Sequence, residues 1–135
     1  MAKSVIADSS ALVALVRHDD QHHAWLDAHL DSLPGPWHTC EAALTETLHL
    51  LGPKGTPAIK EMLRRGGLLF SFSLGDELET VLTLMDKYSD VPMSLADACL
   101  VRMSETLPDP VVVTTDADFK IYRRHSRQVV PCLMP

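Results

Sequence analysis

Short apolar runs alternate along the chain with longer segments in which apolar residues recur at helical spacing. This alternation is typical of βαβ units built around a parallel sheet. Strands are predicted near residues 4–8, 36–40, 68–73, 111–115 and 128–132. Helices are predicted near residues 9–17, 21–32, 40–51, 57–65, 76–89, 94–106 and 116–124. The pattern and the length of 135 residues therefore predict a single α/β domain over residues 1–135.

Acidic residues follow several of these apolar segments. Asp8 comes directly after the run at residues 5–7, and Asp116 follows the β-branched run at residues 111–113. The carboxyl ends of parallel strands meet in one crevice, so these carboxylates are expected to lie close together. Carboxylates in one crevice repel each other unless a divalent cation lies among them. The sequence therefore predicts a metal-dependent site formed by Asp8, Glu46, Asp97, Asp116 and Asp118.

A structural role is open for Asp8, because Asp commonly caps the N-terminus of a helix. Ser9 or Ser10 suits the capping position equally well and would leave Asp8 free to point into the crevice. Glu46 borders the apolar stripe of its predicted helix, where an unpaired carboxylate is costly. Glu41 is explained by the helix dipole, so Glu46 is the better ligand candidate.

Helix capping is also an alternative to metal binding for Asp97 and Asp118. Each lies three residues after a hydroxyl side chain, Ser94 in one case and Thr115 in the other, at the spacing of a capping box. Asp97 nevertheless lies on the inward side of its predicted helix. Asp116 fits a capping box less well, which favours a functional role for it.

The composition does not indicate whether the protein binds nucleic acid. The net charge is −6 with histidines neutral, whereas nucleic-acid binders usually carry an excess of lysine and arginine. Cations bound by the acids would offset part of that charge. No apolar run approaches the roughly 20 residues that cross a bilayer, so no membrane partner is expected. Three widely spaced cysteines without a CxxC pair fit a reducing cytoplasm.

The acids occur in four segments whose order is informative. These are residues 6–12 (IADSSAL), 44–48 (LTETL), 94–98 (SLADA) and 113–119 (VTTDADF). Their order and spacing resemble the PIN domain family, the nucleases that include the VapC toxins of toxin–antitoxin pairs. The resemblance spans essentially the whole chain. Each segment is a weak signal alone, and the four in register are fairly specific.

The resemblance implies a PIN-like fold, a three-layer α/β/α sandwich around a short parallel β-sheet. It implies Mg²⁺- or Mn²⁺-dependent cleavage of RNA. By position, Asp8, Glu46, Asp97 and Asp116 match the family's catalytic and metal-binding quartet, and Asp118 matches a frequent fifth acid. Polar residues that support the acids in relatives are matched by Ser9, Thr114 or Thr115. In toxin relatives an antitoxin protein covers the site and the nuclease forms a homodimer.

The residue types suit this chemistry. Mg²⁺ and Mn²⁺ are hard ions that prefer carboxylates and water, so an all-carboxylate site selects them over zinc. Such an ion lowers the pKa of a bound water and neutralises charge on phosphate oxygens. Phosphate contacts are expected from basic residues near the crevice, with a solvated surface as the alternative. The candidates are Arg17, His18, His22, His23, Lys60, Arg64, Arg65, Lys120, Arg123, Arg124, His125 and Arg127.

Two other functions are open. A catalytically silent PIN-like module that binds RNA or a protein would share the fold, and the weak basicity of the chain motivates this alternative. A phosphotransfer domain also gathers Asp residues at strand ends. However, Asp8 is not followed two residues later by a second Asp, and the predicted strand at residues 68–73 carries no Asp to phosphorylate.

Overall fold

The computed structural model describes residues 3–135, and a five-stranded parallel sheet forms its centre. The strand order is β3-β2-β1-β4-β7. The strands are β1 (Ser4–Ala7), β2 (Trp37–Thr39), β3 (Leu68–Phe70), β4 (Pro110–Val113) and β7 (Cys132–Leu133). Met1 and Ala2, which the predicted domain includes, lie outside the described residues. Because β1 and β4 pair at the centre of the sheet, their carboxyl ends lie side by side.

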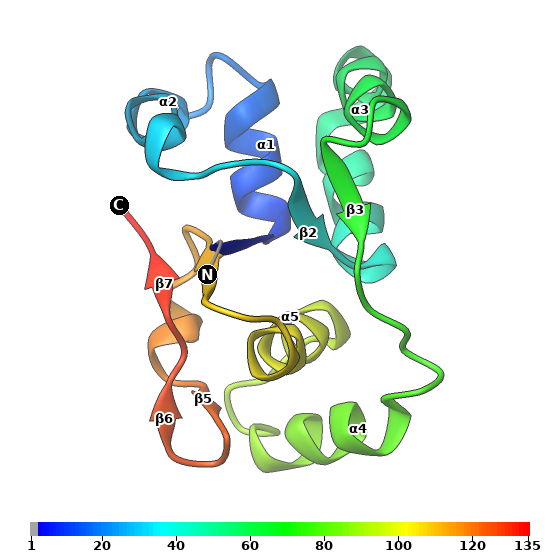
Figure 1. Ribbon diagram of the computed structural model, residues 1–135, viewed down its shortest axis with the longest axis vertical. Helices are drawn as coiled ribbons and strands as arrows, with labels where there is room; N and C mark the ends of the chain where they lie inside the picture. The colour runs from blue at the N-terminus through cyan, green and yellow to red at the C-terminus, as the bar shows by residue number, and fades with distance from the viewer. Residues whose placement is uncertain (1–2) are drawn as a thin grey trace.

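Helices cover both faces of the sheet and complete three layers (Figure 1). One face is covered by α1 (Ser9–Val16), α2 (His23–His29) and α3 (Glu41–Arg64), and the other by α4 (Leu78–Lys87) and α5 (Leu95–Thr106). The predicted α/β/α sandwich around a parallel sheet is confirmed. No helix within residues 3–135 is both long enough and apolar enough to cross a membrane.

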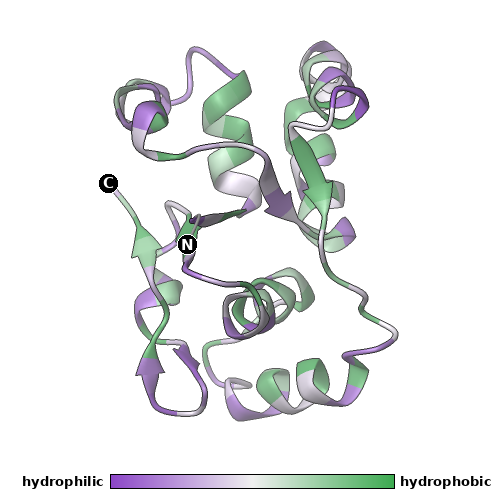
Figure 2. Ribbon diagram, in the orientation of Figure 1, coloured by the Kyte–Doolittle hydropathy of each residue, from purple (hydrophilic) through white to green (hydrophobic). Residues whose placement is uncertain are grey.

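Successive side chains of β1 point to opposite faces of the sheet. They therefore pack in two separate parts of the core, one beneath each helical layer. Val5 and Ala7 pack in one buried cluster with Leu12 of α1, whereas Ile6 packs with Val112 in the cluster on the α5 side. All four residues of β1 are buried, as expected of a central parallel strand with helices on both faces. Figure 2 shows α1 apolar along most of its length, consistent with its packing against α2 and α3.

The C-terminal region differs from the prediction. The strand predicted at residues 128–132 is wrong, because Gln128–Val129 forms β6, which pairs antiparallel with β5 (Arg123–Arg124). The fifth strand of the main sheet is β7, beyond Pro131. Proline has no N–H for a ladder hydrogen bond, so the apolar run is divided into two strands. The helix predicted at residues 116–124 is also wrong, since only the 3₁₀ turn η2 (Ala117–Lys120) forms there.

The boundaries of α3 and α2 also differ from the prediction. The helices predicted at 40–51 and 57–65 are joined in α3, which has a kink at Gly52 (φ 66°, ψ −169°). Proline is suited to the first position of a helix, so Pro53 can start the second half directly after the kink. The helix predicted at 21–32 is divided into α2 and the 3₁₀ turn η1 (Leu30–Ser32).

The kink provides the first prediction. A side chain at Gly52 would meet open space, but its backbone lies in a region that only glycine adopts readily. Gly52→Ala is therefore expected to lower the free energy of unfolding by about 1–3 kcal/mol, measured by urea denaturation. Gly75→Ala is the control, because Gly75 also faces open space and has no positive φ. Equal stability of the two variants would contradict the backbone explanation.

Candidate functional site

Two neighbouring strand ends and the start of one helix bring acids together. β1 and β4 pair in register up to Ala7 opposite Val113, so Asp8 and Thr114 are the next residues beyond the two strands. The backbone N–H of Asp8 donates to the carbonyl of Val113 at 3.1 Å and extends the pairing. α5 packs against both strands and carries Asp97 in its first turn. Asp8 therefore lies at a central strand end and Asp97 at the start of the helix that packs on it, where the sequence pattern places them.

Asp8 is the N-cap of α1 and is only 4% exposed. One carboxylate oxygen accepts from the Ser9 N–H at 2.7 Å, and the other accepts from the hydroxyls of Thr114 at 2.6 Å and Ser10 at 3.3 Å. The capping role therefore belongs to Asp8 and not to Ser9 or Ser10. Burial raises the pKa of Asp8; the hydrogen bonds lower it, and the charge of Asp116 raises it further.

Thr114 links two of the acids through one buried hydroxyl. Its Oγ1 donates to Asp8 and accepts from the backbone N–H of Asp116 at 3.0 Å. Ser10 supports the same corner, with its Oγ 3.3 Å from Thr114 Oγ1 and accepting from the Thr115 N–H at 3.0 Å. Sequence reasoning missed the role of Ser10. The available signal was a hydroxyl two residues after Asp8, at the start of a helix.

Asp97 is 9% exposed and lies within the first turn of α5. The hydroxyl of Ser94 accepts from the Asp97 N–H at 3.0 Å, which is the backbone half of the predicted capping box. The Asp97 carboxylate accepts from the phenol of Tyr122 at 2.8 Å. Burial raises the pKa of Asp97, the bond from Tyr122 lowers it, and the charges of Asp8 and Asp116 raise it again. The cap uses the backbone N–H of Asp97, so the carboxylate is left free for other interactions.

Asp116 and Asp118 lie in the turn that follows β4. Asp116 caps η2 by accepting from the Asp118 N–H at 2.9 Å, so the cap predicted from Thr115 and Asp118 is wrong. Both acids are half-buried. Burial and the hydrogen bond to Asp97 raise the pKa of Tyr122, and the charges of Asp118 and Asp116 add to that increase.

Glu46 approaches the same cluster from α3. The buried stripe of this helix runs through Ala43, Thr47 and Leu51, and Glu46 lies on the exposed flank of that stripe. Partial burial raises the pKa of Glu46, and the charges of the three other acids in the crevice raise it further. Charges act over a limited range near a protein surface, so Glu46 lies near enough to these acids to interact with them electrostatically.

Four carboxylates from four segments of the chain are thus within electrostatic reach of one another. A family model described as PIN domain matches residues 5–124, which include every acid of the cluster. The chain belongs to the PIN domain family. PIN domains are generally nuclease modules, so the domain is of the nuclease class, among the hydrolases. No curated protein matches the chain in sequence.

PIN nucleases generally use divalent metals, and the donor set in this domain suits such an ion. All the donors are carboxylates, the hard oxygen ligands that Mg²⁺ and Mn²⁺ prefer. Burial and mutual repulsion raise the pKa of Asp8, Asp97 and Glu46, and a cation would oppose both effects. Within residues 3–135, no three His, Cys, Asp or Glu side chains are close enough to hold an ion on their own. Because Mg²⁺ keeps several waters in protein sites, the acids fit an ion bound partly through water.

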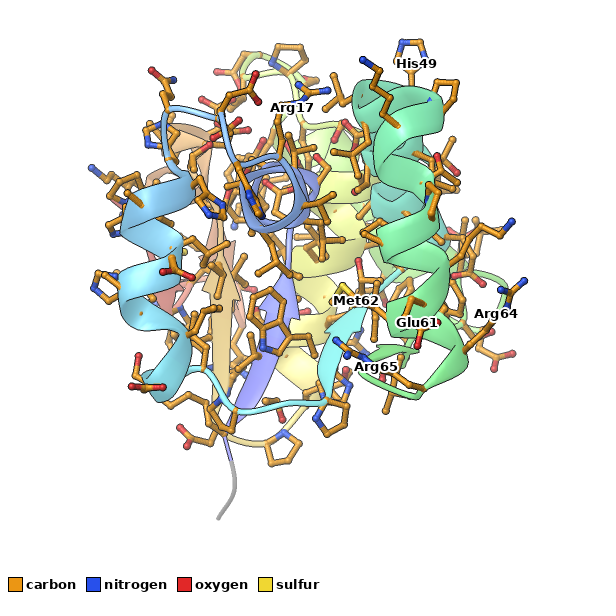
Figure 3. All side chains as sticks on the ribbon, turned by 90° about the horizontal axis from the view of Figure 1, so that it is seen from above. Arg17, His49, Glu61, Met62, Arg64 and Arg65 are labelled. Carbon is orange, nitrogen blue, oxygen red and sulfur yellow. The ribbon has the colours of Figure 1, made fainter. Side chains whose placement is uncertain are left out.

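Two of the basic residues considered for substrate contacts have structural partners. Arg17 donates to the carbonyl of Leu50 at 2.6 Å, close to the kink of α3. Arg123 donates to three carbonyls of the turn that precedes it. Figure 3 shows Arg64 on the outer side of α3 and Arg65 on the side toward the centre of the domain. Arg17 and Arg123 are therefore poor candidates for binding phosphate.

A separate hollow lies between α1 and the second half of α3, with a volume of about 350 Å³. Its lining is apolar in part and carries charged side chains; it consists of Leu15, Val16, His18, Ala58, Glu61, Met62 and Arg65. Figure 3 shows Met62 and Arg65 on the side of α3 that faces the centre of the domain. Sequence reasoning did not find this hollow, because it depends on the angle between two helices.

The repulsion among the acids provides a second prediction, for Glu46→Gln in chelator. A raised folded-state pKa means that the folded protein binds protons more tightly than the unfolded chain. The stability contributed by Glu46 therefore falls as pH rises from its ordinary value of 4.5 through the raised value. Glu46→Gln removes this loss and should raise the melting temperature in EDTA at neutral pH. The gain should stay below about 1 kcal/mol, because solvent screens a largely exposed charge.

The control for this measurement is Glu41→Gln, in the first turn of the same helix. It removes one negative charge that interacts favourably with the helix dipole, so it should not stabilise the protein. The effect of Glu46→Gln should also shrink below pH 4.5, where the wild-type carboxyl becomes neutral. Stabilisation that persists unchanged at acidic pH would exclude charge repulsion as the cause.

Proposed function

We propose that this protein is a metal-dependent endoribonuclease that cleaves RNA phosphodiester bonds with a metal-activated water. The observation that carries the proposal is the convergence of Asp8, Glu46, Asp97 and Asp116, where burial and then mutual charge raise the pKa of Asp8, Glu46 and Asp97. Such a cluster is unfavourable in isolation and becomes favourable around a hard cation. RNA is proposed as the substrate because the four acidic segments resemble those of VapC toxins.

The acids divide into a buried group and an accessible one. Asp8, Asp97 and Asp116 would hold Mg²⁺ or Mn²⁺, directly or through water, with Asp118 as a further ligand from the turn after β4. When bound, the ion supplies a water of lowered pKa and neutralises charge on the phosphate. Glu46 would orient the attacking water or bind a second ion. The hydroxyls of Ser10, Thr114 and Tyr122 keep the buried carboxylates oriented.

The third prediction tests this assignment by RNA cleavage in Mn²⁺ or Mg²⁺. Asp97→Asn keeps the shape of the side chain and removes its charge, so it should lower the cleavage rate at least about 100-fold. EDTA should abolish cleavage by the wild type. Asp90→Asn is the matched control, since Asp90 is exposed and outside the cluster, and it should cleave at the wild-type rate.

Two results would reject the nuclease proposal. One is the absence of RNA cleavage by the wild type with either metal, and the other is full activity of Asp8→Asn. RNA binding that needs no metal and gives no turnover would instead favour the catalytically silent PIN-like module. The net charge of −6 is the observation that motivates this second function.

We extend the proposal to a cytoplasmic VapC-like toxin that forms a homodimer and is inhibited by an antitoxin protein. The order of the acidic segments supports this extension. The hollow between α1 and α3 supports it as well, because Met62 and Leu15 offer apolar contacts and Arg65 offers a basic one. With Glu61 in the same lining, these features suit an amphipathic segment of a partner that carries charged residues of both signs.

A growth experiment provides the fourth prediction. Induced expression of the wild type should arrest a bacterial host, because uncontrolled RNA cleavage stops protein synthesis. Asp97→Asn, expressed at the same level, should relieve the arrest, and Asp90→Asn should not. Normal growth with a wild type that cleaves RNA in vitro would indicate a solitary nuclease and reject the toxin assignment.

A further inference from the structure

The phenol of Tyr122 occupies an unusual position for a polar group. The residue is fully buried, and its hydroxyl donates to Oδ2 of Asp97 at 2.8 Å. A buried hydroxyl needs a hydrogen-bond partner, and here the partner is an acid of the crevice. Because the phenol is fixed by its buried ring and donates to one carboxylate oxygen, this bond restricts how the carboxylate can rotate.

The ring of Tyr122 is itself held from two sides. Phe119 and Tyr88 meet it edge to face, each with ring centroids 5.2 Å apart. Tyr88 has a hydroxyl too, but that hydroxyl accepts from the backbone N–H of Arg123 at 2.9 Å. The chain thus contains two buried tyrosines in contact, of which Tyr122 bonds to an acid and Tyr88 bonds to the backbone.

The backbone of Tyr122 is tied to the turn that carries the next acids. Its N–H donates to the carbonyl of Asp118 at 3.2 Å, and that turn is capped by Asp116. The side chain of Tyr122 reaches α5 while its backbone belongs to the segment after β4. One residue therefore connects the position of Asp97 to that of Asp116.

We propose that Tyr122 is a positioning residue that fixes the Asp97 carboxylate, relative to Asp116, in the orientation that binds the metal ion. This inference rests on the proposed function and deepens it. The phenol occupies Oδ2 of Asp97 and leaves Oδ1 for the ion or one of its waters. Phenylalanine would fill the same space and keep both aromatic contacts, so packing alone does not account for the hydroxyl.

The test compares Mn²⁺ binding by the wild type, Tyr122→Phe and Tyr88→Phe, measured by titration calorimetry. Loss of a group that orients a metal ligand typically weakens metal affinity about 10–100-fold. Tyr122→Phe should therefore bind Mn²⁺ at least about 10-fold more weakly. Tyr88→Phe removes the hydroxyl of the other buried tyrosine, which bonds to the backbone and not to an acid, so its affinity should equal that of the wild type.

Two further readouts separate positioning from a general loss of structure. The melting temperatures of the two variants in EDTA should be similar. Excess Mn²⁺ should restore RNA cleavage by Tyr122→Phe to the wild-type rate, because a weakened site can still be saturated.

Wild-type Mn²⁺ affinity in Tyr122→Phe, or an equal loss in Tyr88→Phe, overturns the inference and leaves the nuclease proposal standing. A wild type that binds Mn²⁺ but cleaves no RNA rejects the nuclease, and the affinities still decide the role of Tyr122. A wild type that binds no Mn²⁺ overturns both.

Discussion

The burial of carboxylates next to one another, at a central strand end and at the start of α5, is the constraint on which the site depends. Asp8 is 4% exposed and Asp97 is 9% exposed, so water screens neither charge well. Each has a raised pKa although each accepts hydrogen bonds, which means that burial outweighs those bonds. The fold holds these two carboxylates in place with hydrogen bonds, from Ser9, Ser10 and Thr114 to Asp8 and from Tyr122 to Asp97.

The pairing of two central strands and two side-chain hydroxyls hold the acids in place. β1 and β4 pair in register over four residues between two buried clusters, which fixes the start of both acid-bearing turns. The hydroxyl of Thr114 then sets Asp116 against Asp8, and the phenol of Tyr122 sets Asp97 against the same turn. Glu46 comes from the exposed flank of α3 and is held by neither hydroxyl. The cluster thus consists of three acids held by hydroxyl groups, Asp8, Asp97 and Asp116, and of the more accessible Glu46. This division would suit a metal ion bound by the three held acids and a substrate that approaches from the side of Glu46.

The central strands and the order of the acids were predictable from sequence, because uninterrupted β-branched runs and strand-end carboxylates are local signals. The capping roles were left open where neighbouring residues suit the same position: the structure shows that Asp8 caps α1, and that Asp116 rather than Thr115 caps η2. Strand β7 was misplaced because apolar periodicity does not indicate which of two short runs joins the sheet. Tyr122 was not predictable, since its function depends on a contact with Asp97, 25 positions away, that no local pattern encodes.

The acidic net charge at first argues against a polyanionic substrate, but its distribution removes the objection. The chain has 18 acidic residues against 12 lysines and arginines, which accounts for the −6. Leaving out the five acids of the crevice and its adjoining turn leaves 13 against 12, so the rest of the chain is close to neutral. The negative charge is therefore concentrated where a cation would neutralise it. With divalent ions bound, a phosphate would meet a local field set mainly by the metal, because bound ions are often the largest charges in such a site.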